Sequence, residues 1–86
     1  MKWQFPLINP TVHYSTDHYI DHVMEEVGEV MAEVDGSSEQ AKEVVDVLHA
    51  AETLVRKFFE RNPQHCFNSV KQEIIRKNTG RGYYEE

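Results

Sequence analysis

The sequence predicts an all-α domain in which two helices form an antiparallel hairpin and a third helix follows. Apolar residues recur with a period near 3.6 in two successive stretches, as expected for one face of an α-helix. The turn Asp35-Gly36-Ser37 separates the two stretches and is short enough to make the helices antiparallel. A chain of 86 residues has room for one domain, which we assign to residues 1–86.

The first predicted helix follows an irregular N-terminal segment, residues 1–14, where Pro6 and Pro10 oppose helix formation. Ser15 or Thr16 can cap the start of this helix. Its apolar stripe consists of Ile20, Val23, Met24, Val27, Val30, Met31 and Val34. The helix is expected to end at Asp35-Gly36, because glycine readily adopts the left-handed conformation that closes a helix.

The second predicted helix begins at Ser37, and Gln40 follows at the spacing of a capping box. Asn62-Pro63 then predicts the cap and the first residue of a third helix. Gly80 and Gly82 interrupt that pattern and leave residues 79–86 as a C-terminal tail.

The small size of the chain predicts self-association. A domain of this length buries too little apolar surface to be very stable alone. The single cysteine, Cys66, excludes an internal disulfide and argues against an oxidising compartment and a cysteine-based zinc site. We see neither a signal peptide nor a membrane span, so no membrane partner is expected and the predicted location is the cytoplasm.

Charge is distributed unevenly along the chain, whose net charge is -6. Residues 17–52 carry eleven acidic side chains and one basic side chain, whereas residues 53–86 carry seven basic and four acidic ones. An acidic half favours cations and a basic half favours phosphate. Nucleic acid is not an expected partner, because the helices with the most regular pattern are the acidic ones.

Two pairs of carboxylates form the candidate site: Glu26 with Glu29, and Glu43 with Asp46. Each pair lies to one side of its helix's apolar stripe, in the same rotational sense, and at a similar distance from the turn. The antiparallel hairpin should therefore bring all four together. Two like charges about 4 Å apart repel by roughly 4 kcal/mol at an effective dielectric of 20, so the group favours protons or a divalent cation. Oxygen ligands suit Mg²⁺, or Mn²⁺ in its place, and Mg²⁺ commonly binds substrate phosphates.

These residues resemble a known signature. Glu26-Val27-Gly28-Glu29 and Glu43-Val44-Val45-Asp46 are similar to the ExxE…ExxD pattern of MazG-like nucleotide pyrophosphohydrolases, of the all-alpha NTP pyrophosphatase superfamily. The ending Lys77-Asn78-Thr79-Gly80-Arg81-Gly82-Tyr83-Tyr84 resembles the tails of short members. The resemblance covers residues 15–84.

The resemblance implies Mg²⁺-dependent hydrolysis of a nucleoside triphosphate, including a deoxy or non-standard one, to the monophosphate and pyrophosphate. It implies that the four carboxylates are the metal ligands and catalytic residues. Substrate would be held by Lys77, Asn78 and Arg81. It also implies a homodimer or homotetramer assembled through four-helix bundles. The alternatives are a phosphoribosyl-ATP pyrophosphohydrolase-like activity and a non-catalytic helical protein that binds nucleotide or mediates oligomerisation.

Several roles stay open on sequence alone. Glu25, Glu29 or another ligand carboxylate could be the general base, and the phosphorus attacked is not specified. His18 and His22, at i and i+4 on the first helix, are disfavoured as metal ligands.

Overall fold

Three helices make up the regular structure of this protein. A computed structural model describes residues 3–8 and 14–84, and in these residues the helices are α1 (Thr16–Ala32), α2 (Ser38–Arg61) and α3 (Phe67–Gly80). The described residues include no strand, which confirms the predicted all-α fold class. Among the same residues, no helix has both the length and the apolar content needed to cross a bilayer.

The predicted capping residues lie at the starts of α1 and α2 and in the turn between these helices. Ser15 Oγ accepts a hydrogen bond from the His18 backbone N–H at 3.2 Å, and Ser37 Oγ accepts one from Gln40 N–H at 3.0 Å. Gly36 has the expected positive φ of 77°. Gln40 binds the turn twice, because its Oε1 accepts from Gly36 N–H at 2.7 Å and its Nε2 donates to the Val30 carbonyl at 3.2 Å.

Two predicted helix ends were wrong. The first helix ends at Ala32 rather than at Asp35, since the Glu33 N–H bonds to the Val30 carbonyl and the Glu33 backbone is extended. The third helix begins at Phe67 rather than at Pro63. Asn62 closes α2 instead of capping α3, because both its backbone N–H and its side-chain amide donate to the Phe58 carbonyl.

The C-terminal tail also begins later than predicted, because Thr79 and Gly80 still belong to α3. The Thr79 hydroxyl donates to the Ile75 carbonyl at 2.7 Å, one helical turn back.

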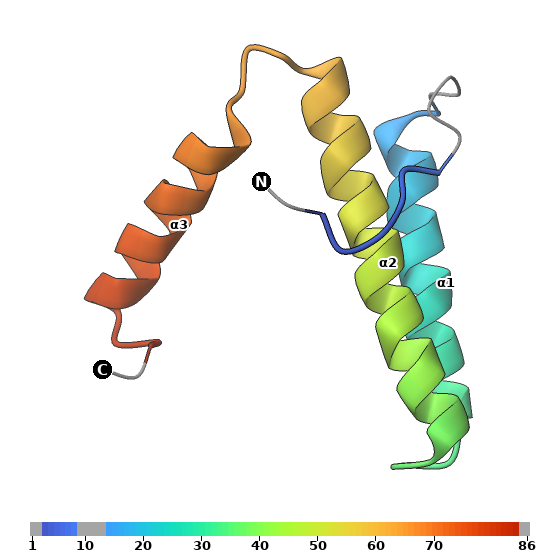
Figure 1. Cartoon of the computed structure of the whole chain (residues 1–86). Helices are drawn as coiled ribbons and strands as arrows, with labels where there is room; N and C mark the ends of the chain where they lie inside the picture. The colour runs from blue at the N-terminus through green and yellow to red at the C-terminus, as the bar shows by residue number, and fades with distance from the viewer. Residues whose placement is uncertain (1–2, 9–13, 85–86) are drawn as a thin grey trace.

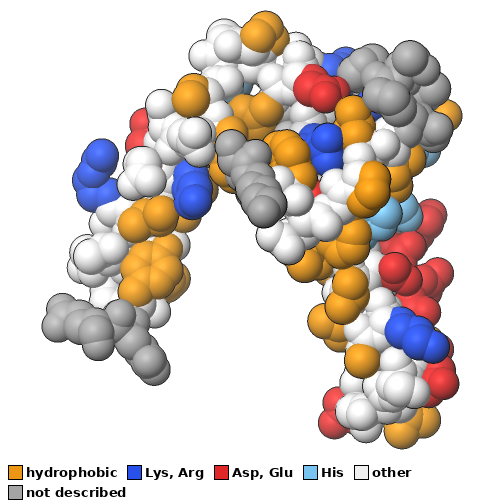
Figure 2. Space-filling model, viewed as in Figure 1, with side chains coloured by type: hydrophobic (Ala, Val, Ile, Leu, Met, Phe, Trp, Pro, Cys, Tyr) orange, Lys and Arg blue, Asp and Glu red, His pale blue; other side chains and the backbone are white. Residues whose placement is uncertain are grey.

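The arrangement of the helices is open. Figure 1 shows α1 and α2 side by side, with the chain reversing between them, whereas α3 diverges from the end of α2. At the start of α3, the Phe67 ring packs edge-on against Phe59 of α2, with ring centroids 5.5 Å apart. Beyond this junction the two helices separate, and the space-filling view shows an open space between α3 and the α1/α2 pair (Figure 2).

Few apolar side chains are buried. Among the described residues, only Tyr19 and Ala50 form the buried hydrophobic core. Large apolar side chains of all three helices and of the α1–α2 turn are exposed: Ile20, Met24, Val27, Met31, Val34, Val44, Val45, Leu48 and Ile74. The helices are therefore amphipathic, as predicted, but much of their apolar surface is not covered within one chain.

The N-terminal segment crosses α2 and is bound there by two charged side chains (Figure 1). Buried Glu52 accepts hydrogen bonds from the backbone N–H groups of Gln4, at 3.0 Å, and Phe5, at 2.8 Å. Arg56 donates to the Phe5 carbonyl at 2.8 Å, and its guanidinium lies 5.0 Å from the centre of the Trp3 ring. Residues 3–8 are irregular, as predicted for this part of the segment, and Pro10 lies outside the described residues.

We expect Glu52→Ala to destabilise the protein by about 2–4 kcal/mol, because the backbone N–H groups of Gln4 and Phe5 lose a buried carboxylate acceptor. Thermal unfolding of this variant should be compared with that of Glu60→Ala, which removes an exposed carboxylate from the same helix. Equal unfolding temperatures for the two variants would contradict the role given to Glu52.

Candidate metal centre

Three carboxylates from two helices meet at the middle of the α1/α2 pair. Glu26 and Glu29 come from successive turns of α1, and Glu43 comes from α2. One oxygen from each side chain lies within 4.8 Å of the others. Glu26 and Glu43 are half-buried and Glu29 is exposed, so the group opens to solvent at one edge.

Asp46, the fourth predicted ligand, is not part of this close group. It is exposed on α2, one turn beyond Glu43. Its negative charge still reaches the group, since it contributes to the raised pKa of Glu43. The structure therefore brings together three of the four predicted carboxylates and leaves Asp46 beside them.

The group is electrostatically unfavourable without a cation. Burial is the main cause of the raised pKa of Glu26, with a further contribution from the neighbouring Glu29, while His22 acts in the opposite direction. The pKa of Glu43 is also raised, first by its hydrogen bond with Glu29 and then by burial. Both pKa shifts indicate that the ionised forms of these carboxylates are destabilised when no cation is bound.

The available oxygen atoms fit a small divalent ion. Oε2 of Glu26 and Oε2 of Glu43 are both buried and have no hydrogen-bond partner. A buried charged oxygen without a partner is costly, and a cation bound beside it would offset that cost. A site made only of carboxylates suits Mg²⁺ or Mn²⁺ better than it suits Zn²⁺.

These pKa shifts predict how stability depends on pH. A carboxyl whose folded-state pKa is raised contributes stability below its ordinary pKa, 4.5, and that stability is lost as pH rises through the raised value. Without divalent ions, the melting temperature should fall as pH rises above about 4.5. Mg²⁺ should reduce this fall, because it binds the deprotonated carboxylates.

Thermal unfolding across this pH range, with Mg²⁺ and with a chelator, measures the effect. Glu43→Gln is the matched variant, since it removes one of the two shifted groups and should flatten the pH dependence measured in chelator. Identical pH profiles with Mg²⁺ and with chelator would contradict the prediction.

The predicted substrate-binding residues lie on a different part of the chain. Lys77 and Asn78 are in the last turn of α3, and Arg81 follows it. The Asn78 side-chain amide lies 3.4 Å from the Tyr84 hydroxyl, and the Arg81 guanidinium lies over the Tyr83 ring, 4.6 Å from its centre. Because α3 diverges from the α1/α2 pair, one chain does not bring these three residues to its own carboxylates (Figure 1).

Figure 2 shows how the charges separate. Acidic side chains gather along the edge of the α1/α2 pair that faces away from α3, whereas hydrophobic side chains cover the part that faces the open space. Glu25, a candidate general base, lies outside the close carboxylate group. It lines a shallow polar hollow on α1 together with His18, Asp21 and His22.

One contact at the site is absent from the sequence-based prediction. His22 Nε2 lies 3.1 Å from Oε1 of Glu26. The spacing i, i+4 places the two side chains on adjacent turns of the same face, and this was the signal available in the sequence. The prediction considered His22 only as a partner of His18.

Comparisons with protein-family models, with curated proteins and with solved structures found no match to this chain. The function must therefore be argued from the carboxylate group and from the residues around it.

Proposed function

We propose that this chain is a cytoplasmic, Mg²⁺-dependent hydrolase that converts a nucleoside triphosphate into the monophosphate and pyrophosphate. The observation that carries the proposal is the convergence of Glu26, Glu29 and Glu43, two of which have a buried oxygen without a partner. The resemblance of the two carboxylate pairs to the MazG-like signature supports it.

The chemistry follows from the charges involved. Mg²⁺, when bound, would neutralise charge that develops on the phosphate oxygens. Glu26, Glu29 and Glu43 would hold the ion, and Asp46 would add a further negative charge beside them. Water adds to one phosphorus of the α–β anhydride, the anhydride bond breaks, and the products are the monophosphate and pyrophosphate. A carboxylate of the group accepts the proton of that water.

Pyrophosphate release from a panel of nucleotides, with and without Mg²⁺, tests the proposal. The panel should contain ribo, deoxyribo and non-standard triphosphates, and also phosphoribosyl-ATP. Release from phosphoribosyl-ATP alone would favour the related pyrophosphohydrolase activity. Binding of nucleotides without release would favour a non-catalytic protein.

A double variant links any activity to the site. Glu29→Gln combined with Asp46→Asn keeps the side-chain shapes but removes two negative charges. Pyrophosphate release that survives this double change would exclude the proposed site, even if the protein proved to be a hydrolase.

We further propose that the protein works as a homodimer or homotetramer. A compact monomer of 10.1 kDa should expose about 5,300 Å², whereas this chain exposes 6674 Å². Its radius of gyration is 15.2 Å, against about 12 Å for a compact domain of this length. The excess area, roughly 1,400 Å², is enough for one side of a stable protein–protein interface, about 800 Å².

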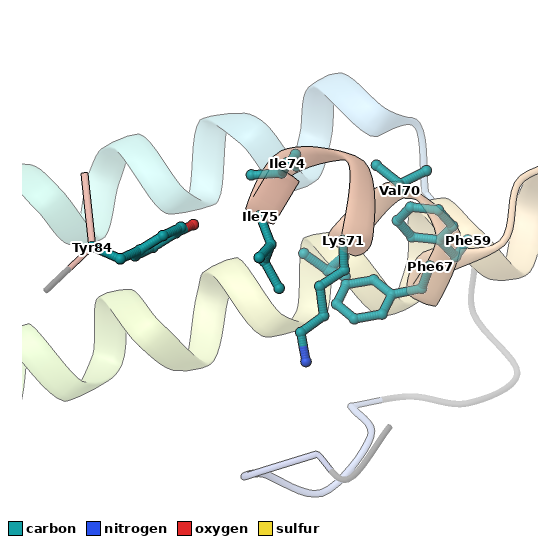
Figure 3. A pocket seen from close by; sticks show the side chains of 8 residues that line it. Phe59, Phe67, Val70, Lys71, Ile74, Ile75 and Tyr84 are labelled. Carbon is teal, nitrogen blue, oxygen red and sulfur yellow. The ribbon is translucent and has the colours of Figure 1, made fainter. Parts of the chain in front are cut away.

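Two apolar surfaces are available for this contact. Val27, Val30, Val44 and Val47 line a shallow groove between α1 and α2. A larger concavity of about 420 Å³ lies between α2 and α3. Figure 3 shows its apolar side chains, with Lys71 at the rim; they are Val55, Phe59, Phe67, Val70, Ile74, Ile75 and Tyr84.

A second copy of the chain would also bring the substrate-binding residues of α3 and the C-terminal tail close to a carboxylate group. We propose that Lys77, Asn78 and Arg81 of one chain bind the phosphates of a nucleotide held by the carboxylates of another. This arrangement joins the acidic edge of one chain to the basic C-terminal end of α3 from its neighbour.

Mixing two inactive variants tests this arrangement. Glu29→Gln and Arg81→Ala should each lose most activity alone. Subunit exchange should restore activity, to roughly a quarter of the sites if dimers mix at random, because some sites then combine two intact halves. Mass spectrometry should verify that the two variants have exchanged subunits. If activity is still not restored, Arg81 acts in the site of its own chain or in no site.

A further inference from the structure

The carboxylate of Glu26 is hydrogen-bonded by a histidine on its own helix. His22 Nε2 lies 3.1 Å from Oε1 of Glu26, one turn away at i, i+4. The side chain of His22 is 44% exposed and that of Glu26 is 16% exposed. The pair therefore spans the boundary between solvent and the carboxylate group.

The two oxygens of Glu26 have different surroundings. Oε1 has His22 as its partner, whereas Oε2 is buried and has none. An ionised carboxylate only accepts hydrogen bonds, so His22 must carry a proton on Nε2 when Glu26 is charged. The bond then fixes the rotation of the carboxyl group and leaves Oε2 available to a cation.

We propose that His22 is a positioning residue of the divalent-ion site: its Nε2–H holds Oε1 of Glu26 and thereby presents Oε2 to an ion shared with Glu29 and Glu43. This inference rests on the proposed function and adds a residue outside the carboxylate pattern. Hydrogen-bond partners of metal ligands commonly affect metal affinity by about 10–100-fold. His22 acts through Glu26 because its Nε2 is already engaged by that side chain.

Titration with Mn²⁺ in the absence of nucleotide, followed by electron paramagnetic resonance, tests the role. We expect His22→Ala to raise the Kd for Mn²⁺ about tenfold. His22→Gln keeps an N–H donor and should remain within about threefold of the unaltered protein. His18→Ala is the matched control, since His18 lies one turn earlier on α1 and stacks on Tyr14.

The melting temperature without divalent ions separates positioning from a purely structural role. We expect it to differ little between His22→Ala and His22→Gln, although their Mn²⁺ affinities differ. An unchanged Kd in His22→Ala, or a Kd equally weak in His22→Gln, would overturn the inference. A nitrogen coupling to bound Mn²⁺ that His22→Ala removes would also overturn it, because His22 would then be a direct ligand.

The same titration distinguishes this inference from the proposed function. Mn²⁺ binding that depends on His22, without pyrophosphate release from any nucleotide, would overturn the hydrolase and leave the positioning role standing. Absence of Mn²⁺ binding by the unaltered protein would overturn both. Binding and hydrolysis that are both insensitive to His22 would overturn the positioning role alone.

Discussion

Glu43→Gln is expected to lower Mg²⁺-dependent pyrophosphate release by about 100-fold or more. The substitution removes the negative charge of a proposed metal ligand, whose Oε2 is buried without a hydrogen-bond partner. Metal ions contribute several kcal/mol to stabilising transition-state charge, and each 1.36 kcal/mol is about a tenfold change in rate. The measurement is kcat/KM at saturating Mg²⁺ for the best nucleotide of the panel.

The same variant should be more stable than the unaltered protein when a chelator removes divalent ions. Glu43 lies beside Glu26 and Glu29, and the interaction with these carboxylates contributes to its raised pKa. Glutamine keeps the shape and removes the charge, so the melting temperature in chelator should rise. The unaltered protein should gain stability from Mg²⁺ by mass action, and the variant should gain less.

Glu60→Gln is the control for both measurements, because Glu60 is exposed on the same helix and lies outside the carboxylate group. Activity of Glu43→Gln within about threefold of the unaltered protein would remove Glu43 from the catalytic machinery. A lower melting temperature in chelator would show that the carboxylate stabilises the fold rather than serving the site.

Local signals predicted the helices well. Ser15, Ser37 and Gly36 each act within a few residues of their position, so their capping and turn roles can be inferred from sequence alone. The start of α3 was harder to predict, because Asn62-Pro63 fits the end of one helix as well as the beginning of another. The hydrogen bonds from Asn62 back to Phe58 decide between the two, and they are visible only in the structure.

The approach of three of the four carboxylates to one another could be predicted from the sequence. Helical spacing places Glu26 beside Glu29, and the chain reversal at Gly36 brings Glu43 to the same level. Asp46 is exposed and lies outside the close group, and neither the rotation of α2 about its axis nor the rotamer of Asp46 can be inferred from sequence. The spacing alone does not determine such rotations.

Contacts between distant parts of the chain could not be predicted. Glu52 binds Gln4 and Phe5 across 48 and 47 residues, respectively, and nothing in the local sequence around Glu52 distinguishes it from other acidic residues of the helix. The direction of α3 is similarly undetermined, since its apolar side chains could pack on their own chain or on another. The structure leaves them largely uncovered, and the self-association proposal follows from that exposure.

Leu48→Glu is expected to abolish self-association, and with it most of the helical structure at micromolar concentration. Leu48 is 51% exposed on α2, and Val44 and Val45, at helical spacing from it, are exposed as well. On an isolated chain this exchange should cost little, within about 0.5 kcal/mol, because an exposed position tolerates a charge. At a buried interface between copies, an unpaired carboxylate costs several kcal/mol, so the dissociation constant should rise by about 100-fold or more.

Sedimentation equilibrium and circular dichroism over a range of concentrations measure the two consequences. The unaltered protein should sediment as a dimer or tetramer, and its melting temperature should increase with concentration, since association stabilises the folded state by mass action. Gln72→Glu is the control, because it places the same side chain at an exposed polar position of α3. A stable, fully helical species of 10.1 kDa in the unaltered protein would contradict the prediction, and the basic end of α3 would then have no route to the carboxylates.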